Sequence, residues 1–403
     1  MKVLQLLAVA LTLFISCAPE AGYPDSEDRI VRHLSIFEAP GEYCAWPSVA
    51  RTADGDIIVL YCKSEEHLGP DGAILLSRST DNGETWLDPV VIYDTPIDDR
   101  ESGITALSDG RLLIHYWSTF HTPEKYDALR PLAYEKDVLE RWKHFVVTAE
   151  YKSAESVEGG WNSLSTDGGK TWSRPVRGED SNHGGIELED GRILIGSYRN
   201  TRDSVAVNIA NEPLSRWETI ATVAPPTPDS LRFGEPHLLQ LESGRIVMMM
   251  RATVKPYNDM DPRCYLWCTY SDDSGKTWAE PYETPLWGFP PHLMQLSDGR
   301  VLVSYGYRRP PFGQRACISE DGVTWKLENE IVLRHDAPNK DLGYPVSIEL
   351  GPGVVLSIYY QPNVPAGTYQ EMDPPDPERT KPGILGTIWN VPPRYEKEQT
   401  PEK

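Results

Sequence analysis

Basic side chains are scarce in this chain of 403 residues. It has 39 lysines and arginines against 60 aspartates and glutamates, which gives a formal net charge of -21 at pH 7. Such an acidic protein is repelled by polyanions, so we do not expect nucleic acid or an anionic membrane surface as a partner. Helical periodicity is scarce as well, whereas 31 glycines and 35 prolines are typical of many short strands joined by tight turns.

Cysteines are few, and their spacing excludes two common uses. Those that follow Cys17 are odd in number, which excludes a complete disulfide framework: Cys44, Cys62, Cys264, Cys268 and Cys317. Cys264 and Cys268 are too far apart to bridge on one extended strand, and hairpin register places Cys44 and Cys62 a residue or two out of line. No pattern resembles a cysteine metal site, and we expect neither a metal nor another cofactor.

Long apolar runs are limited to residues 3–15, which are too few to cross a bilayer as a mature anchor but suit a signal-peptide core. The run ends in Phe-Ile-Ser-Cys17, which resembles the bacterial lipobox. We therefore predict a signal peptide over residues 1–17, lipidation of Cys17 and a flexible tether over residues 18–28. The protein would then lie in the bacterial cell envelope and touch the membrane only through its lipid anchor. Ordinary secretion with an incidental cysteine is the alternative.

A short turn motif of the form S-x-D-x-G-x-T-W, an Asp box, occurs four times. The copies begin at Ser79, Ser165 and Ser271 and, in a shortened form, at Ser319. The aspartate caps the loop, the glycine supplies a positive φ and the tryptophan packs its ring beneath the turn. The segment Asn211–Trp217 resembles an eroded copy.

A second repeat, a strand-turn-strand segment, gives the period of the fold. Its turn glycines recur at nearly constant intervals, apart from one longer interval between the second and the third: Gly55, Gly110, Gly191, Gly244, Gly299 and Gly353. Units of this length suit four-stranded sheets, so the sequence predicts an all-β fold, a six-bladed β-propeller of antiparallel blades over residues 29–395.

Three further features follow from this repeat. The long second interval predicts an insertion at about residues 118–159, with a short helix over residues 134–147. Residues 30–37 are expected to complete the sixth sheet, which would close the ring and remove its free edges. Residues 396–403 form a polar tail.

The functional site is expected where the innermost strands meet at the propeller axis. Pairing around the turn at Gly244 places Glu235 opposite Arg251 or nearly so. The strand that leaves the turn ends in arginine in three blades, at Arg199, Arg251 and Arg308. Three guanidinium groups on one rim match an anion such as a carboxylate, so we predict an anion site. Ordinary ion pairs at strand ends are the alternative.

Three histidines recur at similar distances before the turn glycines, at His183, His237 and His292. Glu235 and His237 are two residues apart and therefore share one face of a strand. Histidines in this pattern indicate packing, contacts with a sugar or proton transfer. A metal is less consistent with the pattern, because no cluster of carboxylates with ligand spacing accompanies them.

Together these residues resemble the sialidase (neuraminidase) superfamily over nearly the whole chain after residue 28. The resemblance is carried by the Asp boxes, by the segment from Glu235 to Arg251 and by Tyr344 in Gly-Tyr-Pro-Val-Ser. It implies that Tyr344 is a nucleophile and that Glu235 removes its phenolic proton, because a carboxylate nucleophile would be repelled by the substrate carboxylate. It also implies that Arg251 and Arg308 are the second and third members of a triad that binds this carboxylate.

The resemblance places an acid/base aspartate on a first-blade loop, where Asp71 is the candidate and Glu65, Glu66 and His67 are alternatives. The sequence departs from the family at the first triad arginine, because Ala45, followed by Trp46, stands there. Losing one charge-assisted contact costs about 1.5 to 3 kcal/mol. The residues considered for compensation are Lys63, Arg100 and Arg199.

Three functions are consistent with these residues. One is an enzyme, a sialidase-like exo-glycosidase that removes a terminal acidic sugar with retention through a tyrosyl intermediate. Another is a related propeller hydrolase or lyase for a uronic acid or deoxysugar, with His183, His237 or His292 as acid/base. The third is a surface glycan-binding protein without turnover, in which aromatic rings stack on sugars: Trp46, Trp117, Tyr198 and Tyr307. Each predicts a terminal sugar at the axial face.

Overall fold

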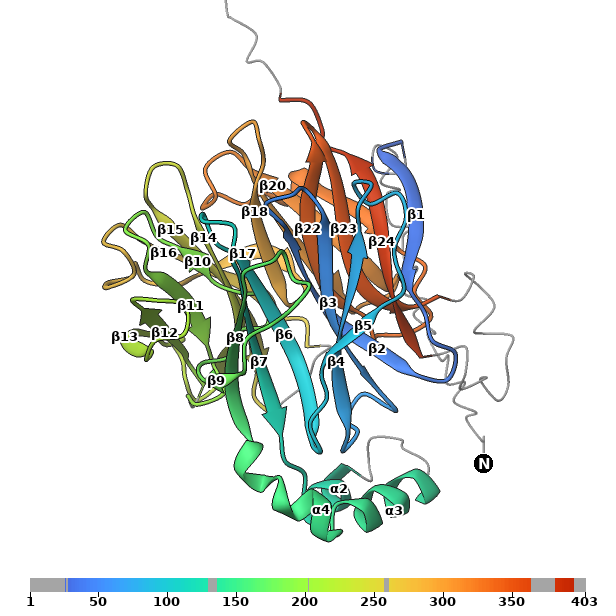
Figure 1. Cartoon of the computed structure of the whole chain (residues 1–403). Helices are drawn as coiled ribbons and strands as arrows, with labels where there is room; N and C mark the ends of the chain where they lie inside the picture. The colour runs from blue at the N-terminus through green and yellow to red at the C-terminus, as the bar shows by residue number, and fades with distance from the viewer. Residues whose placement is uncertain are drawn as a thin grey trace, which may run out of the picture.

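The computed structural model describes residues 26, 28–129, 136–201, 203–256, 261–363 and 381–394. Over these residues the chain forms six antiparallel four-stranded sheets arranged as a ring (Figure 1), which confirms the predicted six-bladed β-propeller. The predicted signal peptide, Cys17 and the polar tail lie outside the described residues. No helix within the described part is long and apolar enough to span a membrane.

Each blade is a meander whose first strand lies nearest the ring axis. Blade 1 contains β2 (Tyr43–Arg51), β3 (Ile57–Ser64), β4 (Gly72–Ser79) and β5 (Val90–Tyr93). Blade 2 contains β6 (Asp98–Ala106), β7 (Leu112–Thr119), β8 (Gly159–Ser165) and β9 (Val176–Arg177). Blade 3 contains β10 (Ile186–Glu187), β11 (Ile193–Ser197), β12 (Val205–Ala210) and β13 (Glu218–Val223).

The second half of the ring repeats this order. Blade 4 contains β14 (Leu231–Gln240), β15 (Ile246–Val254), β16 (Tyr265–Ser271) and β17 (Tyr282–Trp287). Blade 5 contains β18 (Pro291–Gln295), β19 (Val301–Tyr307), β20 (Gly313–Ser319) and β21 (Glu330–Arg334), with the 3-10 turn η3 (Leu327–Asn329) before β21. Blade 6 contains β22 (Gly343–Gly351), β23 (Val354–Pro362), β24 (Pro382–Asn390) and the N-terminal β1 (Ile30–Phe37), which pairs with β24 as expected.

The core lies between neighbouring blades. The middle strands read as continuous apolar runs because both of their faces are covered; in β3, for example, only Lys63 is not fully buried. One apolar cluster joins blades 3 and 4, and another joins blades 6 and 1 through Tyr61, Val346 and Ile358. All five cysteines of the described chain are buried and free, and Cys62 pairs in register with Ala45 rather than with Cys44.

The insertion between β7 and β8 is helical. It contains α2 (Pro123–Leu129), α3 (Lys136–Phe145), α4 (Ala149–Ser153) and the 3-10 turn η2 (Glu155–Val157), so more of it is helical than the short segment expected over 134–147. These helices lie together at one end of the ring (Figure 1). They have a small core of their own, in which Tyr126, Trp142 and Tyr151 pack against Ile97 of the blade 2 entry.

A repeated irregularity of the innermost strands positions side chains at the axis. In β2, β6, β14 and β22 the pairing register shifts near the start of the strand, and one non-glycine residue there has positive φ: Trp46 (56°), Glu101 (49°), Glu235 (44°) and Tyr344 (49°). Each precedes its turn glycine by nine positions. A β-bulge of this kind turns one side chain out of the regular alternation and stores backbone strain, and both features are concentrated at functional sites.

Candidate active site

The four bulge residues meet in one cavity, which we call the axial cavity. It has a volume of about 260 Å³ and receives side chains from all six blades. Its lining residues are Trp46, His67, Leu68, Arg100, Glu101, Thr119, His121, Lys125, Arg199, Glu235, Arg251, Arg308 and Tyr344. Of the residues predicted to form the site, the structure therefore brings together Tyr344, Glu235, Trp46 and the arginines at 100, 199, 251 and 308.

A phenol, a carboxylate and a guanidinium form a connected chain in this cavity. The hydroxyl of Tyr344 donates a hydrogen bond of 2.7 Å to Oε1 of Glu235. Nη1 of Arg251 donates to both carboxylate oxygens of Glu235 at 2.9 Å. Burial, followed by the charges of Glu235 and Glu101, raises the pKa of Tyr344 well above its ordinary value. The phenol therefore keeps its proton at neutral pH and directs it at a carboxylate that can accept it.

Two arginines of the cavity share a support. The guanidinium carbons of Arg251 and Arg308 lie 4.2 Å and 5.1 Å from the centroid of the Phe289 ring. Arg308 is also fixed by the carbonyl of Leu342, which accepts from its Nε at 2.9 Å, and by the hydroxyl of Tyr360 at 3.0 Å from its Nη2. Because their orientation is set before a ligand enters, these two groups are suited to bind one anion.

The other two arginines are held by carboxylates. Arg100 donates to Asp98 at 3.0 Å, and its guanidinium carbon lies 4.3 Å from the centroid of the Trp46 ring. Arg199 binds Asp180 at 2.8 Å and also pairs with Glu101. Burial tends to raise the pKa of Asp98, but Arg100 and a hydrogen bond from His121 outweigh burial and lower it. Asp98 is therefore ionised, and it fixes Arg100 without itself lining the cavity.

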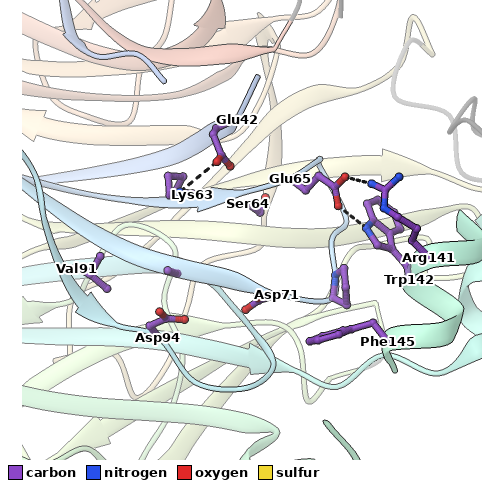
Figure 2. Close-up of a pocket in the computed structure, with 12 residues that line it drawn as sticks. Glu42, Lys63, Ser64, Glu65, Asp71, Val91, Asp94, Arg141, Trp142 and Phe145 are labelled. Carbon is purple, nitrogen blue, oxygen red and sulfur yellow. Dashed lines mark hydrogen bonds and ion pairs between the residues drawn. The ribbon is translucent and has the colours of Figure 1, made fainter. Parts of the chain in front are cut away.

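Two predicted residues, Asp71 and Lys63, do not line the axial cavity. Both line a second cavity between blade 1 and the insertion (Figure 2), which we call the side cavity. Hairpin register pairs Lys63 with Cys44, and Nζ of Lys63 lies 3.5 Å from a carboxylate oxygen of Glu42. Asp71, the acid/base candidate, and Lys63, one of the three residues considered to compensate for Ala45, therefore lie away from the nucleophile, because the loop after β3 turns Asp71 toward the side cavity and the bulge in β2 pairs Lys63 with Cys44 and not with Trp46.

The three histidines also lie outside the axial cavity. They line a hollow at the hairpin end of the innermost strands, and His237 and His292 stack with 4.4 Å between ring centroids. Main-chain N–H groups of Leu293 and Ser347 donate to Nδ1 of these two rings at 2.8 Å and 3.4 Å. A neutral ring that accepts at Nδ1 carries its proton on Nε2, so Nε2 is a donor and not a metal ligand. Among the described residues, no group of three or more His, Cys, Asp or Glu is arranged to hold a metal ion.

Sequence reasoning missed several residues of the axial cavity. Glu101 stands nine positions before Gly110, the place that Glu235 and Tyr344 occupy in their own blades, so comparison of the repeats would have found it. His67 was only an alternative acid/base candidate, whereas the structure places it in the cavity. Lys125 belongs to α2 of the insertion and to no repeat, so the sequence carries no signal for it. The aromatic residues Trp117, Tyr198 and Tyr307 do not line this cavity.

Comparison with known proteins places the chain in a family. The family model described as a BNR repeat-like domain matches residues 137–356, more than half of the chain. The chain belongs to the BNR repeat-like domain family. The match confirms the membership in a family of BNR-repeat propellers that the repeats of the sequence predicted. A search of curated proteins found no match to the sequence.

Several solved structures resemble this BNR propeller. A protein of unknown function from Dyadobacter fermentans is 25% identical, with a TM-score of 0.70 over 90% of this chain and 99% of the other. The NanB sialidase from Streptococcus pneumoniae is 12% identical, with a TM-score of 0.59 over 88% and 70% of the two chains. The GH93 α-L-arabinofuranosidase of Fusarium graminearum is 13% identical, with a TM-score of 0.57 over 90% and 98%. At such low identity, the likeness to these two enzymes shows a common fold.

Proposed function

We propose that this BNR propeller is a retaining exo-glycosidase that removes a terminal acidic sugar, sialic acid or a similar sugar, from a glycan. The observation that carries the proposal is the hydrogen bond of 2.7 Å from Tyr344 to Glu235, in a cavity that Arg251 and Arg308 also line. The arginines supply an anion site beside a phenol whose proton already has an acceptor. A sialidase among the structures with this fold supports the same reading.

The residues suit a two-step reaction. In the first step the Tyr344 oxygen attacks the anomeric carbon, its proton passes to Glu235, and the bond to the leaving oxygen breaks. In the second step water attacks the tyrosyl glycoside, the phenol regains its proton and the sugar is released with retained configuration. A neutral phenol suits this role better than a carboxylate, because an anionic nucleophile would be repelled by an acidic substrate.

His67 is the best placed group to protonate the leaving oxygen. Its Nδ1 lies 2.6 Å from the hydroxyl of Tyr43, and that hydroxyl donates to Oδ1 of Asp341 at 2.8 Å. Because the phenolic proton of Tyr43 is used on Asp341, Nδ1 of His67 carries a proton and donates to Tyr43. When Nε2 also carries a proton, it gives that proton to the leaving oxygen, and its lone pair then takes a proton from the attacking water.

Arg100 is the residue that best replaces the missing triad arginine. Lys63 lies outside the axial cavity, and both Arg100 and Arg199 pair with two carboxylates, Arg100 with Asp98 and Glu101 and Arg199 with Asp180 and Glu101. What distinguishes Arg100 is its place over Trp46, the neighbour of Ala45, which brings a guanidinium from blade 2 to the blade 1 side of the cavity. Its second nitrogen is fixed by the carbonyl of His67 at 3.0 Å.

The test is a set of methylumbelliferyl glycosides of sialic acid, uronic acids, deoxysugars and neutral sugars, with the wild-type protein and the variant Tyr344→Phe. We expect release from an acidic glycoside, retained configuration by NMR and a loss of at least ~1,000-fold in kcat/KM in Tyr344→Phe. A fluorinated acidic sugar that traps the intermediate should add its mass to the peptide that contains Tyr344. Full activity of Tyr344→Phe on the acidic substrate would contradict the proposal.

A second candidate is a glycosidase for a neutral sugar that uses a pair of carboxylates. Glu101 and Glu235 occupy equivalent bulges and both line the axial cavity, and an arabinofuranosidase shares the fold. Glu235 would then be the nucleophile, and Tyr344 would only orient it. This candidate predicts turnover of a neutral glycoside that is abolished in Glu235→Gln but largely kept in Tyr344→Phe.

Attachment to the cell envelope is a separate proposal that rests on the sequence alone. Phe-Ile-Ser-Cys17 after the apolar run supports lipidation of Cys17. Incorporation of a labelled fatty acid by cells that express the full chain, and its loss in Cys17→Ser, is the expected result. Equal labelling of both proteins would contradict it.

A further inference from the structure

The side cavity is built from the same two segments as the axial cavity. In the loop after β3, Ser64, Glu65, Pro70 and Asp71 line the side cavity, whereas His67 and Leu68 line the axial cavity. The insertion likewise supplies Lys125 to the axial cavity and Phe145 to the side cavity. The loop therefore stands as a wall between two cavities, and the side cavity, with a volume of about 560 Å³, is the larger one.

This wall is held in place on both sides. A Cβ added to Gly72 would lie 2.3 Å from Oδ1 of Asp98, the carboxylate that binds Arg100 of the axial cavity. On the other side, Nε1 of Trp142 donates to Oε2 of Glu65 at 2.8 Å, and Arg141 pairs with the same carboxylate (Figure 2). The insertion is thus fastened to the loop, so the side cavity is a formed feature of the fold.

The lining of the side cavity has a charge opposite to that of the axial cavity. Lys63 is paired with Glu42, and Arg141 is paired with Glu65. Two carboxylates remain, those of Asp71 and Asp94, and within the described chain neither has a hydrogen-bond or ion-pair partner. Unpaired carboxylates accept hydrogen bonds from hydroxyl groups and repel a second acidic group.

An exposed aromatic ring completes this lining. The side chain of Phe145 is 39% exposed, and its ring is held edge to face against Tyr151 with 5.4 Å between centroids. Figure 2 shows Phe145 on the insertion side and Asp71 and Asp94 on the blade 1 side of the same space. A fixed ring opposite hydroxyl acceptors suits the apolar face and hydroxyl edge of a neutral sugar.

From this arrangement we propose that the side cavity binds the neutral sugars that follow the acidic terminal sugar of the substrate. This inference rests on the proposed function, since it takes the axial cavity as the site of the terminal sugar. The basic axial cavity and the acidic side cavity then select an oligosaccharide with an acidic end and a neutral body. The substrate is an extended glycan and not a small glycoside.

The experiment compares kcat/KM for sialic acid joined to lactose with kcat/KM for the methylumbelliferyl glycoside of sialic acid. The variants are Phe145→Ala and Asp94→Asn, which change opposite walls of the side cavity. We expect each to lower kcat/KM for the trisaccharide about tenfold and to leave the aryl glycoside unchanged. Val147→Ala is the matched control, because Val147 is an exposed apolar side chain of the same insertion, 44% exposed, that does not line the cavity.

Equal effects on both substrates, or no effect on either, would overturn the side cavity as a sugar site. A wild-type protein that turns over neither substrate would instead count against the proposed function. In that case a glycan array that carries the same oligosaccharides with and without an acidic end decides the inference. Weaker binding of the neutral oligosaccharides by Phe145→Ala and Asp94→Asn than by wild type supports it, and equal binding overturns it.

Discussion

Arg100 lies over the ring of Trp46, with 4.3 Å between the guanidinium carbon and the ring centroid. The two residues come from neighbouring blades, and Trp46 owes its position to the bulge in β2, where its φ is 56°. A positive charge on blade 2 is thereby placed beside Ala45, which cannot bind an anion. The contact explains how the cavity keeps its basic character without an arginine on the first strand.

We expect Arg100→Lys to raise KM for an acidic substrate about tenfold and to change kcat less, because lysine keeps the charge but loses the planar fork. The lysine still compensates the buried Asp98, so the fold should persist. Steady-state kinetics with the acidic aryl glycoside measure the effect. Arg78→Lys is the control, since Arg78 binds Asp56 at 2.8 Å away from the axial cavity. A KM equal to that of wild type would show that Arg100 does not contact the substrate anion.

His67→Ala should affect substrates according to their leaving group. If His67 protonates the leaving oxygen, its loss lowers kcat/KM about 100-fold for glycosides of alcohols and much less for glycosides of acidic phenols, which leave without a proton. A series of aryl and alkyl glycosides provides the measurement. His144→Ala, an exposed histidine on α3, is the control. An equal loss across the series would indicate that His67 binds substrate without transferring a proton.

The repeats made the fold predictable. Turn glycines at a nearly constant spacing mark one blade each, and the same pattern placed β1 in the sixth sheet. Glu235 was predictable from its pairing around the turn at Gly244, Arg251 and Arg308 from their place at the ends of the strands that leave the turns, and Tyr344 from the family resemblance; all four line the axial cavity. In a propeller, residues at equal distances from equivalent turns lie at the same height along the ring axis.

Residues outside the repeat could not be placed in this way. Asp71 and His67 are four residues apart on one loop, yet only His67 lines the axial cavity, and the direction of a loop follows from contacts such as that of Glu65 with Trp142. Lys125 comes from an insertion whose docking depends on its own small core. His183, His237 and His292 line the hollow at the hairpin end and not the axial cavity, because they stand only seven or eight positions before their turn glycines, closer to the turns than the bulge residues do.

Two glycines with positive φ, Gly244 of a strand-connecting turn and Gly275 of an Asp box, distinguish backbone strain from packing between blades. Gly244 and Gly275 have φ values of 84° and 83°, but a Cβ on Gly244 meets nothing within 4 Å, whereas one on Gly275 lies 2.9 Å from Cδ2 of Leu194 in blade 3. We expect Gly244→Ala to lower the free energy of unfolding by about 1 to 2 kcal/mol through strain alone. Gly275→Ala should cost about 1 to 3 kcal/mol more because it also overpacks the contact. Urea unfolding measures the free energy of unfolding of both variants. Equal losses of stability would mean that the interface between blades accommodates the added methyl group without destabilising the protein.

The three buried histidines at the hairpin end predict how the free energy of unfolding depends on pH. Burial lowers the pKa of His237 to about 3, and burial together with the charge of His237 lowers those of His183 and His292 well below the ordinary value of 6.5. The unfolded chain therefore takes up protons that the native protein excludes, so the free energy of unfolding falls as the pH drops below 6.5. Between pH 7.5 and pH 5 each such histidine removes about 2 kcal/mol.

His237→Asn isolates one of these contributions. The Oδ1 atom of asparagine takes the place of Nδ1 and can accept the hydrogen bond that the main-chain N–H of Leu293 donates at 2.8 Å. The variant should be less stable than wild type at pH 7.5, because a ring is lost from the stack, but its loss of stability down to pH 5 should be about 2 kcal/mol smaller. Urea unfolding of both proteins at the two pH values tests this. Parallel pH dependences would mean that His237 takes up its proton in the native state, and the stack with His292 at 4.4 Å would then have to open in acid.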